Sequence, residues 1–348
     1  MFMKEREIAL YRKYRPQKFD EVLGQDHIIK VLEGSLKLGN ITHAYLFSGS
    51  RGTGKTSVAR IIAKELKCSL NDIHEIDAAS NRGVDDIREL REAVRTLPFD
   101  SEYKVYIIDE VHMLTKEAFN ALLKTLEEPP RHVIFILATT EFNKVPETIV
   151  SRCQSFVFKK PTDAILKKLI IDLAKKEKFK MDNGSVELIA LLGDGAFRDT
   201  IGILQKVISF SKDNKISLEE VEQVTGAPRG TLVNEFLESI VFSDLGKGFA
   251  SIKKACQQNI DMKVYLKIVL YKLRTALLLR YAPEINKELE EKFSKEDIKF
   301  LEGLLMEKGD KISSKTLLIL LDAYQNLHGA FIPELPLELA LVKIIKEE

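Results

Sequence analysis

One short segment, GSRGTGKT at residues 49–56, constrains the fold more than any other feature of this sequence. It fits the pattern G-x-x-x-x-G-K-[ST], with an apolar run at 45–47 before it and a helical pattern at 58–66 after it. Its glycines let backbone N–H groups surround a phosphate, and the following helix N-terminus adds its positive end. The alternative is a glycine-rich turn without a ligand. The context favours a nucleotide-binding loop formed by Gly49, Gly52, Thr53, Gly54, Lys55, Thr56 and Ser57.

Short β-branched or aromatic runs alternate with longer helical patterns from residue 44 to about 158. This alternation is typical of a parallel sheet with crossover helices. The sequence therefore predicts an α/β domain with strands at 44–48, 73–77, 104–109, 132–138 and 155–158, and with helices at 55–66, 84–96 and 116–127.

The pattern changes after Pro161, where strand signals disappear and amphipathic helical segments follow one another. Ser217, with Glu220 three residues later, has the spacing of a capping box. Helical patterns in the last third lie at 232–241, 246–258, 262–281, 294–306 and 314–327. A chain of 348 residues exceeds what one hydrophobic core usually fills, so several domains are expected. The glycine- and proline-containing segment 226–230 is typical of a linker. We predict a nucleotide-binding domain at 1–161 and helical domains at 162–227 and 228–348.

Two carboxylates, Asp109 and Glu110, follow the buried-strand run at 105–108. Parallel sheets present ligands at the carboxyl ends of their strands, so Asp109 is a candidate to support a metal ion and Glu110 to polarise water. In isolation the pair could equally be a solvated strand end, but the phosphate loop strengthens the functional interpretation. Thr140 could orient the same water, although threonine is also an ordinary strand residue.

Two arginines, Arg152 and Arg198, are candidates to stabilise charge on a transferred phosphoryl group. The residues around them do not place them near a phosphate, and a lone arginine is usually a solvated surface residue. From the residues alone, the surface interpretation is favoured for both.

Composition restricts the setting of the protein. The 53 basic and 52 acidic residues leave a formal net charge of +1, so any contact with nucleic acid must be local. The three cysteines lie far apart and form no CxxC pair, which argues against a disulfide framework. The sequence has neither a signal-peptide core nor a run of about eighteen apolar residues, so we expect a cytoplasmic protein without membrane contact.

Further segments match a pattern that is known from one family. They are YRP at 14–16, VLGQ at 22–25, EIDAAS at 75–80, IDEVHML at 108–114, ALLKTLEEPP at 121–130, SRC at 151–153 and ELPLELAL at 334–341. Together with the phosphate loop, they resemble the gamma/tau subunit family of the bacterial DNA polymerase III clamp loader. The likeness is dense from residue 5 to about 160, weaker in the next domain and only helical in the last third.

The resemblance implies an AAA+ fold, with a helical lid at 162–227 and an all-α collar at 228–348. It implies that ATP and Mg²⁺ bind, with Thr56 and Asp109 at the metal. Lys55, Glu110 and Thr140 would then serve catalysis, and the surface interpretation of the two arginines reverses. Arg152 would act in trans on ATP of a neighbouring subunit, and Arg198 would sense the γ-phosphate within this chain.

The resemblance also implies where the adenosine and the DNA bind. The adenosine would lie against Arg12, Arg15, Pro16 and Val22, although this N-terminal arm could instead merely pack on the domain. Ser80, Asn81 and Arg82 would face DNA phosphates, since hydroxyl, amide and guanidinium groups contact phosphate without reading bases. A solvated loop is nearly as good an interpretation of these three residues.

An arginine that acts in trans implies an oligomer, because no monomer completes its own site. The resemblance names the partners: other copies of this chain, the delta and delta-prime subunits, the sliding clamp, primer-template DNA and DNA polymerase III. The ring would open the clamp and load it onto DNA during replication.

Two departures from the family pattern affect these expectations. The family usually carries a four-cysteine zinc module after the phosphate-loop helix, but here CSLNDIH at 68–74 bridges that interval. One cysteine cannot make a four-cysteine site, so we predict no structural zinc. The sequence also stops at Glu348, without the long extension of the tau form.

Two other functions remain open at this stage. One is a structural ring subunit that binds nucleotide without hydrolysing it, as delta-prime-like subunits do; the intact Lys55, Thr56, Asp109 and Glu110 argue against it. The other is a different DNA-directed AAA+ motor, such as a replication-factor-C type small subunit or a branch-migration motor. Their second motifs differ from the one found here.

Overall fold

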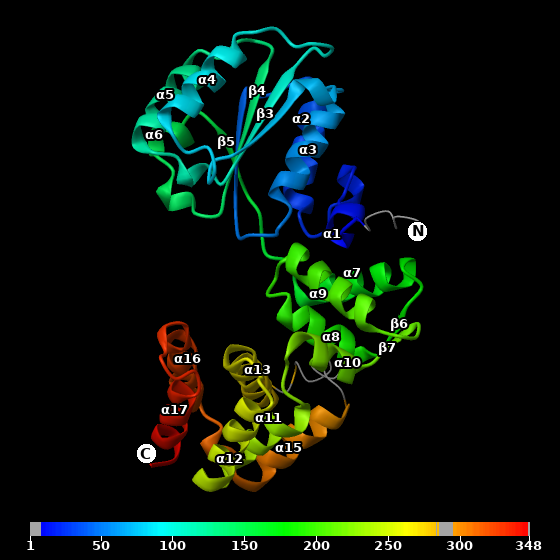
Figure 1. The fold of residues 1–348 in the computed structure, drawn as a ribbon, viewed down its shortest axis with the longest axis vertical. Helices are drawn as coiled ribbons and strands as arrows, with labels where there is room; N and C mark the ends of the chain where they lie inside the picture. Colours follow the sequence, from blue (N-terminus) through cyan, green and yellow to red (C-terminus); the bar gives the residue numbers. More distant parts are fainter. Residues whose placement is uncertain (1–7, 283, 285–294, 347–348) are drawn as a thin grey trace, which may run out of the picture. The chain divides into compact units, whose positions relative to one another are not determined.

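A computed structural model of the chain describes residues 8–282, 284 and 295–346. By their internal contacts, the residues form two compact units, one of Met1–Leu169 with Gly193–Gly202 and one of Ile170–Leu192 with Ile203–Glu348 (Figure 1). Residues 162–227 are thus shared between the two units, and the division of the chain into three domains stays a prediction.

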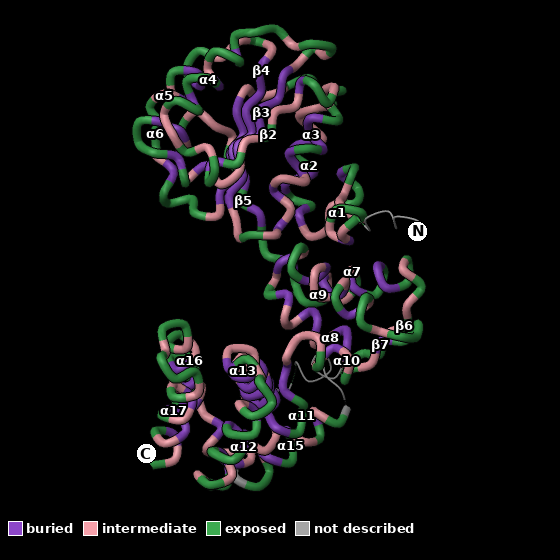
Figure 2. The backbone as a smooth tube through the Cα atoms, viewed as in Figure 1, coloured by how far each residue is buried: buried purple, intermediate pink, exposed green. Residues whose placement is uncertain are grey.

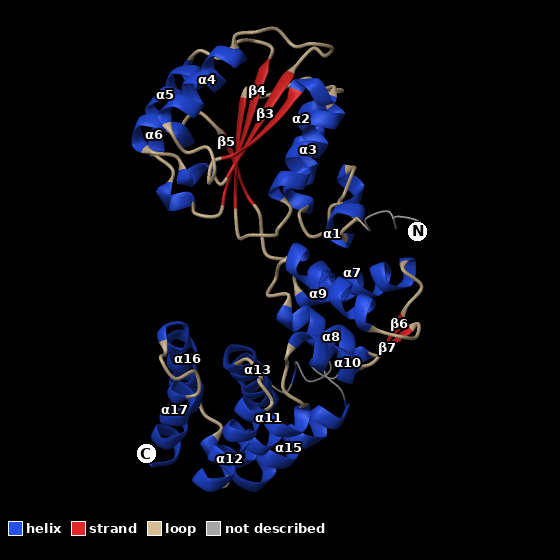
Figure 3. Cartoon of the chain, viewed as in Figure 1, coloured by secondary structure: helices blue, strands red, loops and turns tan. Residues whose placement is uncertain are grey.

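A five-stranded parallel sheet forms the centre of the first unit (Figure 3). The strand order is β2-β3-β4-β1-β5, which places β4 between the strand before the phosphate loop and the strand before the two carboxylates. The predicted parallel sheet is confirmed, and each predicted strand end agrees with the structure to within one residue. The strands are β1 (Ala44–Ser48), β2 (Ile73–Asp77), β3 (Lys104–Asp109), β4 (Val133–Thr139) and β5 (Gln154–Val157).

Helices cover both faces of this sheet, because successive strand residues point to opposite sides. Tyr45 and Phe47 of β1 pack with α2 (Asp26–Lys37) and α3 (Lys55–Glu65). Leu46, between them, packs on the other face in a core with helices that lie on the far side of the sheet in Figure 1. These helices are α4 (Val84–Val94), α5 (Lys116–Glu127) and α6 (Glu147–Val150). The central strands are buried except for Asp109 at the end of β3, which is half-buried, and Figure 2 shows the buried residues in purple.

The first unit also contains several short elements and parts of longer helices. The N-terminal arm forms α1 (Leu10–Lys13), and a 3₁₀ turn, η3 (Val111–Met113), follows the two carboxylates. Helices α7 (Asp163–Lys176) and α9 (Phe197–Phe210) each have residues in both units.

The second unit is almost entirely helical, and its largest apolar core is formed by buried residues between Ala227 and Ile344. The helical patterns predicted for the last third are confirmed, except that Ser294, the predicted start of one of them, lies outside the described residues. One expectation was wrong: β6 (Lys180–Met181) and β7 (Lys215–Ile216) form a small parallel pair after Pro161. Strands of two residues are too short to show a period in the sequence. The helices are α8 (Asn183–Leu192), α10 (Leu218–Thr225), α11 (Gly230–Val241), α12 (Leu245–Gln257), α13 (Met262–Tyr281), α15 (Lys295–Lys308), α16 (Ser314–Asn326) and α17 (Leu335–Lys346).

Two local signals of the sequence are reproduced at α10. The Ser217 side chain accepts a hydrogen bond from the Glu220 amide, and the Glu220 carboxylate accepts one from the Ser217 amide, which is the predicted capping box. The helix ends before Gly226, whose φ of 66° is readily adopted by glycine. In the described part of the chain, no helix has both the length and the apolar character needed to span a membrane.

Candidate nucleotide-binding site

The phosphate loop runs from the end of β1 to the first turn of α3, as the sequence predicts. Its three glycines have φ angles of 143° (Gly49), 74° (Gly52) and 104° (Gly54), which L side chains rarely adopt. A Cβ atom added at Gly49 would lie 2.4 Å from the Phe158 carbonyl oxygen. The loop therefore needs glycine for its backbone conformation and, at Gly49, for the close approach of a neighbouring segment.

Lys55 opens α3 and lies across the loop. Its Nζ atom donates to the carbonyl oxygens of Gly49 at 2.7 Å and Ser50 at 2.9 Å, and the residue is 6% exposed. Burial lowers the pKa of Lys55, while the nearby Glu110 and Asp109 carboxylates oppose that shift. The loop thus holds a buried cation at its centre, where an anion would gain most from it.

Thr56, in the first turn of α3, and Asp109, the last residue of β3, meet at the carboxyl ends of the strands. The Thr56 Oγ1 atom donates to Asp109 Oδ2 at 2.9 Å. Hydroxyl and carboxylate oxygens are the donors that Mg²⁺ prefers, so the predicted metal-binding pair fits this ion chemically. Ser57, the next residue of α3, lies in the same helical turn.

The Glu110 side chain is held by Thr140, the residue that follows β4. Its Oε2 atom accepts from Thr140 Oγ1 at 2.9 Å and from the Thr140 amide at 3.3 Å. The backbone of Glu110 is left-handed, with a φ of 49° that is uncommon outside glycine. The two candidate residues Glu110 and Thr140 are thus in direct side-chain contact, and their roles toward a water molecule stay a prediction.

A histidine that the sequence analysis did not single out completes this cluster. His112 Nδ1 lies 3.0 Å from Thr139 Oγ1 and 3.4 Å from Glu110 Oε2, and its Nε2 lies 3.3 Å from Glu141 Oε1. The His112 side chain is only 6% exposed. Its place three residues after Asp109 was visible in the sequence, but only the adjacency of β3 and β4 gives it these partners.

Gln25 is a second residue that was quoted in a motif but given no role. It is fully buried, and its Nε2 atom donates to the carbonyl oxygens of Thr53 at 3.4 Å and Lys159 at 2.8 Å. Its Oε1 atom accepts from the Lys159 amide at 3.2 Å. Gln25 therefore ties the phosphate loop to the chain that leaves β5.

Residues 193–202 lie against the phosphate loop and belong to the same unit. The Phe197 amide donates to the Gly52 carbonyl oxygen at 2.9 Å, and a Cβ atom added at Gly52 would lie 2.9 Å from the Ala196 Cβ. This contact brings the backbone of Arg198 to the loop. The Arg198 guanidinium itself lies over the Tyr11 ring, 5.1 Å from the ring centroid.

The N-terminal arm brings the predicted adenosine-binding residues to the same unit, but its contacts do not place a nucleotide. Arg12 is exposed and its Nε atom donates to the Tyr11 hydroxyl at 3.2 Å. Arg15, Pro16 and Val22 are half-buried. Burial and the nearby Arg60 lower the pKa of Arg15.

Arg152 lies away from the phosphate loop of its own chain. The loop follows Ser48 at the carboxyl end of β1, whereas Arg152 precedes Gln154, which pairs with Tyr45. Tyr45 and Ser48 are three residues apart along β1, which corresponds to roughly 10 Å. Its guanidinium donates to Glu127 Oε1 at 2.6 Å and to the Thr148 carbonyl oxygen at 2.8 Å.

The segment predicted to face DNA phosphates forms a turn after β2. Asp77 organises it by accepting from the Ala79 amide at 2.9 Å and from the Ser80 hydroxyl at 3.4 Å, while the Asn81 amide group donates to the Asp77 carbonyl oxygen at 3.0 Å. Ser80 and Arg82 are exposed. Their role toward DNA stays a prediction.

A buried carboxylate, that of Asp72, lies in the segment where the family pattern has a zinc module. Asp72 is 1% exposed and accepts from the amides of Phe99 at 2.6 Å and Asp100 at 3.0 Å, and from the Ser69 hydroxyl at 3.0 Å. Burial alone would raise the pKa of Asp72, but these hydrogen bonds outweigh it and hold the pKa well below its usual range. Among the described residues no cluster of three or more His, Cys, Asp or Glu is arranged to hold a metal, and the absence of zinc stays a prediction.

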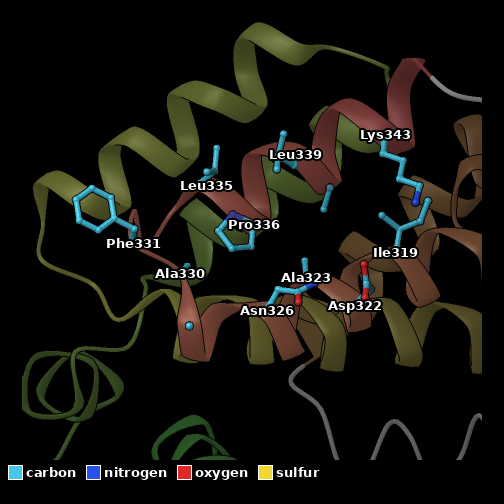
Figure 4. Close-up of a pocket in the computed structure, with 12 residues that line it drawn as sticks. Ile319, Asp322, Ala323, Asn326, Ala330, Phe331, Leu335, Pro336, Leu339 and Lys343 are labelled. Atoms are coloured by element: carbon cyan, nitrogen blue, oxygen red, sulfur yellow. The ribbon is translucent and has the colours of Figure 1, made fainter.

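A separate hollow lies in the second unit between α16 and α17, with a volume of about 440 Å³. Figure 4 shows Phe331, Leu335, Pro336 and Leu339 around it. Lys343 is the one cation among its lining residues. Such a largely apolar hollow is unsuited to a triphosphate, and the loop after β1 stays the candidate nucleotide site.

Solved structures identify the class of protein. The chain matches the structure of the Thermotoga maritima RuvB Holliday junction branch migration motor with a TM-score of 0.53 and 25% identity, over 66% of this chain and 79% of that one. In this chain, as the strand order shows, β4 lies between β1, which leads into the phosphate loop, and β3, which leads into the two carboxylates. The structural match and this topology together make the chain an AAA+ protein.

Sequence relatives narrow the class to one family. The chain is 36% identical to the DNA polymerase III subunit gamma of Buchnera aphidicola, over 80% of each chain, and 39% identical to the subunit tau of Bacillus subtilis, over 97% of this chain and 63% of that one. A family model described as DNA polymerase III, delta subunit, matches residues 24–83 and 69–162. The chain belongs to the DNA polymerase III gamma/tau family. It spans about half the length of several curated relatives, 41% to 63% of the first five.

Proposed function

We propose that this chain is the ATPase subunit of a DNA polymerase III clamp loader, which uses ATP binding and hydrolysis to open a sliding clamp and load it onto primer-template DNA. The observation that carries this proposal is that side chains at or beyond the carboxyl ends of β1, β3 and β4 contact one another. Thr56 bonds to Asp109, and Glu110 bonds to Thr140. A subunit that only binds nucleotide has no need for the second of these pairs.

In the proposed reaction, each residue acts on a different part of ATP. The loop amides and Lys55 hold the phosphates, and Lys55 exchanges its bonds to Gly49 and Ser50 for bonds to phosphate oxygens. Thr56 and Asp109 would hold Mg²⁺, which neutralises charge on the phosphates when it is bound. Glu110 polarises the attacking water, and Thr140 fixes the orientation of that carboxylate.

The two arginines would complete the site from different chains. Arg198 is carried on a segment anchored to Gly52, which supports a role toward the γ-phosphate in its own chain. Arg152 lies at the amino end of β5 and is about one-third exposed, which supports a role toward ATP in a neighbouring subunit. A ring with the delta and delta-prime subunits and further copies of this chain would provide that neighbour.

Further proposed contacts concern DNA and the rest of the replication machinery. Ser80, Asn81 and Arg82 are proposed to contact the DNA backbone, for which their exposed turn is suited. DNA polymerase III is proposed as the enzyme that uses the loaded clamp. The runner-up functions are a non-hydrolysing ring subunit and another DNA-directed AAA+ motor, the second being favoured only by the fold shared with RuvB.

Steady-state ATP hydrolysis tests the proposal. This chain is combined with the delta, delta-prime and clamp proteins of its organism, with and without primer-template DNA, and Glu110→Gln serves as the control that keeps nucleotide binding. We expect hydrolysis to rise sharply only when the clamp and primed DNA are both present, and to be absent in the control. Unstimulated hydrolysis would indicate another motor, and binding without hydrolysis would indicate a structural subunit.

A further inference from the structure

The contact between Arg198 and Tyr11 joins two segments that are far apart in the sequence. The Arg198 guanidinium lies 5.1 Å from the centroid of the Tyr11 ring, and the Arg12 guanidinium lies 5.8 Å from the same centroid. The Arg12 Nε atom also donates to the Tyr11 hydroxyl at 3.2 Å. The ring thus receives two guanidinium groups, and their positive charge lowers the pKa of the Tyr11 phenol, with the Arg12 hydrogen bond as the largest cause.

The backbone beside Arg198 is held independently of this contact. Phe197 donates its amide to the Gly52 carbonyl oxygen at 2.9 Å, so the segment is fixed on the phosphate loop. The Arg198 side chain is exposed and has several rotatable bonds. Its guanidinium can therefore leave Tyr11 without any movement of the segment that carries it.

We propose that Tyr11 is a positioning residue that holds the Arg198 guanidinium on the N-terminal arm until a γ-phosphate draws it away. This inference rests on the proposed function, in which Arg198 acts on the γ-phosphate. ATP must break the Arg198–Tyr11 contact to use this arginine, whereas ADP has no γ-phosphate and leaves the contact in place. The arm therefore helps the site to distinguish the two nucleotides.

The expected size of the effect follows from the strength of such contacts. An exposed cation–π pair is a weak interaction, and a site that is competent for only part of the time binds its ligand correspondingly less tightly. Loss of the ring should therefore tighten binding of ATP by roughly two- to fivefold and leave binding of ADP unchanged.

Nucleotide titrations of the full chain test this inference. AMP-PNP, a non-hydrolysable ATP analogue, and ADP are titrated calorimetrically into the wild type, Tyr11→Leu and Tyr11→Phe. We expect Tyr11→Leu to bind AMP-PNP roughly two- to fivefold more tightly. Tyr11→Phe keeps the ring and loses the hydroxyl and its hydrogen bonds with Arg12 and Arg198, so its affinity should lie between those of the wild type and Tyr11→Leu. In an Arg198→Ala background, Tyr11→Leu should have no further effect on either nucleotide.

A fluorescence measurement reports the contact directly, because the chain contains no tryptophan. Tyr11→Trp places a single tryptophan under the guanidinium, and tryptophan is the aromatic residue that binds cations best. We expect AMP-PNP to change its emission and ADP to change it much less. The double variant with Arg198→Ala should give the same response to both nucleotides.

The outcomes separate this inference from the proposed function. If neither nucleotide binds to the wild type, the proposed function fails and the inference falls with it. If both bind and Tyr11→Leu weakens them equally, Tyr11 belongs to the adenosine contact and the inference is wrong. An unchanged ratio of AMP-PNP to ADP affinity in Tyr11→Leu, with no selective change in tryptophan emission, would also overturn it.

Discussion

The contact between the phosphate loop and residues 193–202 can be tested by adding one methyl group. In Gly52→Ala the new Cβ atom would lie 2.9 Å from the Ala196 Cβ, and the residue would keep a φ of 74°. The Ala196 methyl is attached directly to the backbone, so it cannot rotate away. Either the loop or the 193–202 segment has to move.

A matched control separates the backbone strain from the steric contact. Gly39 has a φ of 70° and no atom within 4 Å of an added Cβ. Gly39→Ala should therefore lower the free energy of unfolding only through the strain of the left-handed backbone, by about 1–2 kcal/mol. Gly52→Ala should cost the same strain plus about 1–3 kcal/mol for overpacking.

Urea unfolding of both variants measures these free energies, and nucleotide titration measures the functional consequence. We expect Gly52→Ala to lose more stability than Gly39→Ala and to weaken ATP binding, because Arg198 moves with its segment. Gly39→Ala should bind ATP like the wild type. Equal destabilisation by the two substitutions, with ATP binding retained in Gly52→Ala, would refute the conclusion that this contact shapes the site.

Three further predictions concern single side chains. Lys55→Ala should weaken ATP binding by roughly 10- to 150-fold in calorimetry, since it removes charge-assisted bonds to phosphate, and unchanged affinity would contradict the site. Arg152→Ala, assembled with its partner subunits, should still bind ATP while its hydrolysis rate falls by roughly 10³-fold; a wild-type rate would make Arg152 a surface residue. Asp72→Asn should cost about 1.5–3 kcal/mol at pH 7, because the hydrogen bonds from the Phe99 and Asp100 amides lose their charged acceptor. The folded-state pKa of Asp72 lies below its unfolded value of 3.8, so its contribution is present above that pH and is lost as the pH falls. Urea midpoints should therefore show the gap between wild type and Asp72→Asn narrowing from pH 7 to pH 3, and a constant gap would contradict this reasoning.

The sequence analysis was most accurate where a local pattern repeats over several residues. Buried parallel strands are continuous apolar runs, so β1 and β3 could be bounded to the residue. The capping box at Ser217 and Glu220 is likewise a local signal. The pair of β6 and β7 was missed because two residues give no period.

The site itself divides in the same way. The residues alone predicted a phosphate loop at 49–56 from the glycine pattern, and the structure gives Gly49, Gly52 and Gly54 positive φ angles that glycine readily adopts. The contacts of Gln25, His112 and Tyr11 could not be read there. The partners that decide these contacts are distant in sequence: Thr139 lies 27 residues from His112, and Arg198 lies 187 residues from Tyr11.

The sequence by itself thus determined the strands of the main sheet, the phosphate loop and the types of residue available for phosphate chemistry. Tertiary structure alone decided which of them meet. The strand order places β4 between β1 and β3, and this arrangement brings Thr140 to Glu110 and keeps Arg152 at the opposite end of the sheet from the loop. The physical reason is that local patterns fix backbone conformation through short-range sterics and burial, whereas side-chain contacts across the sheet depend on strand order and register, which no single segment encodes.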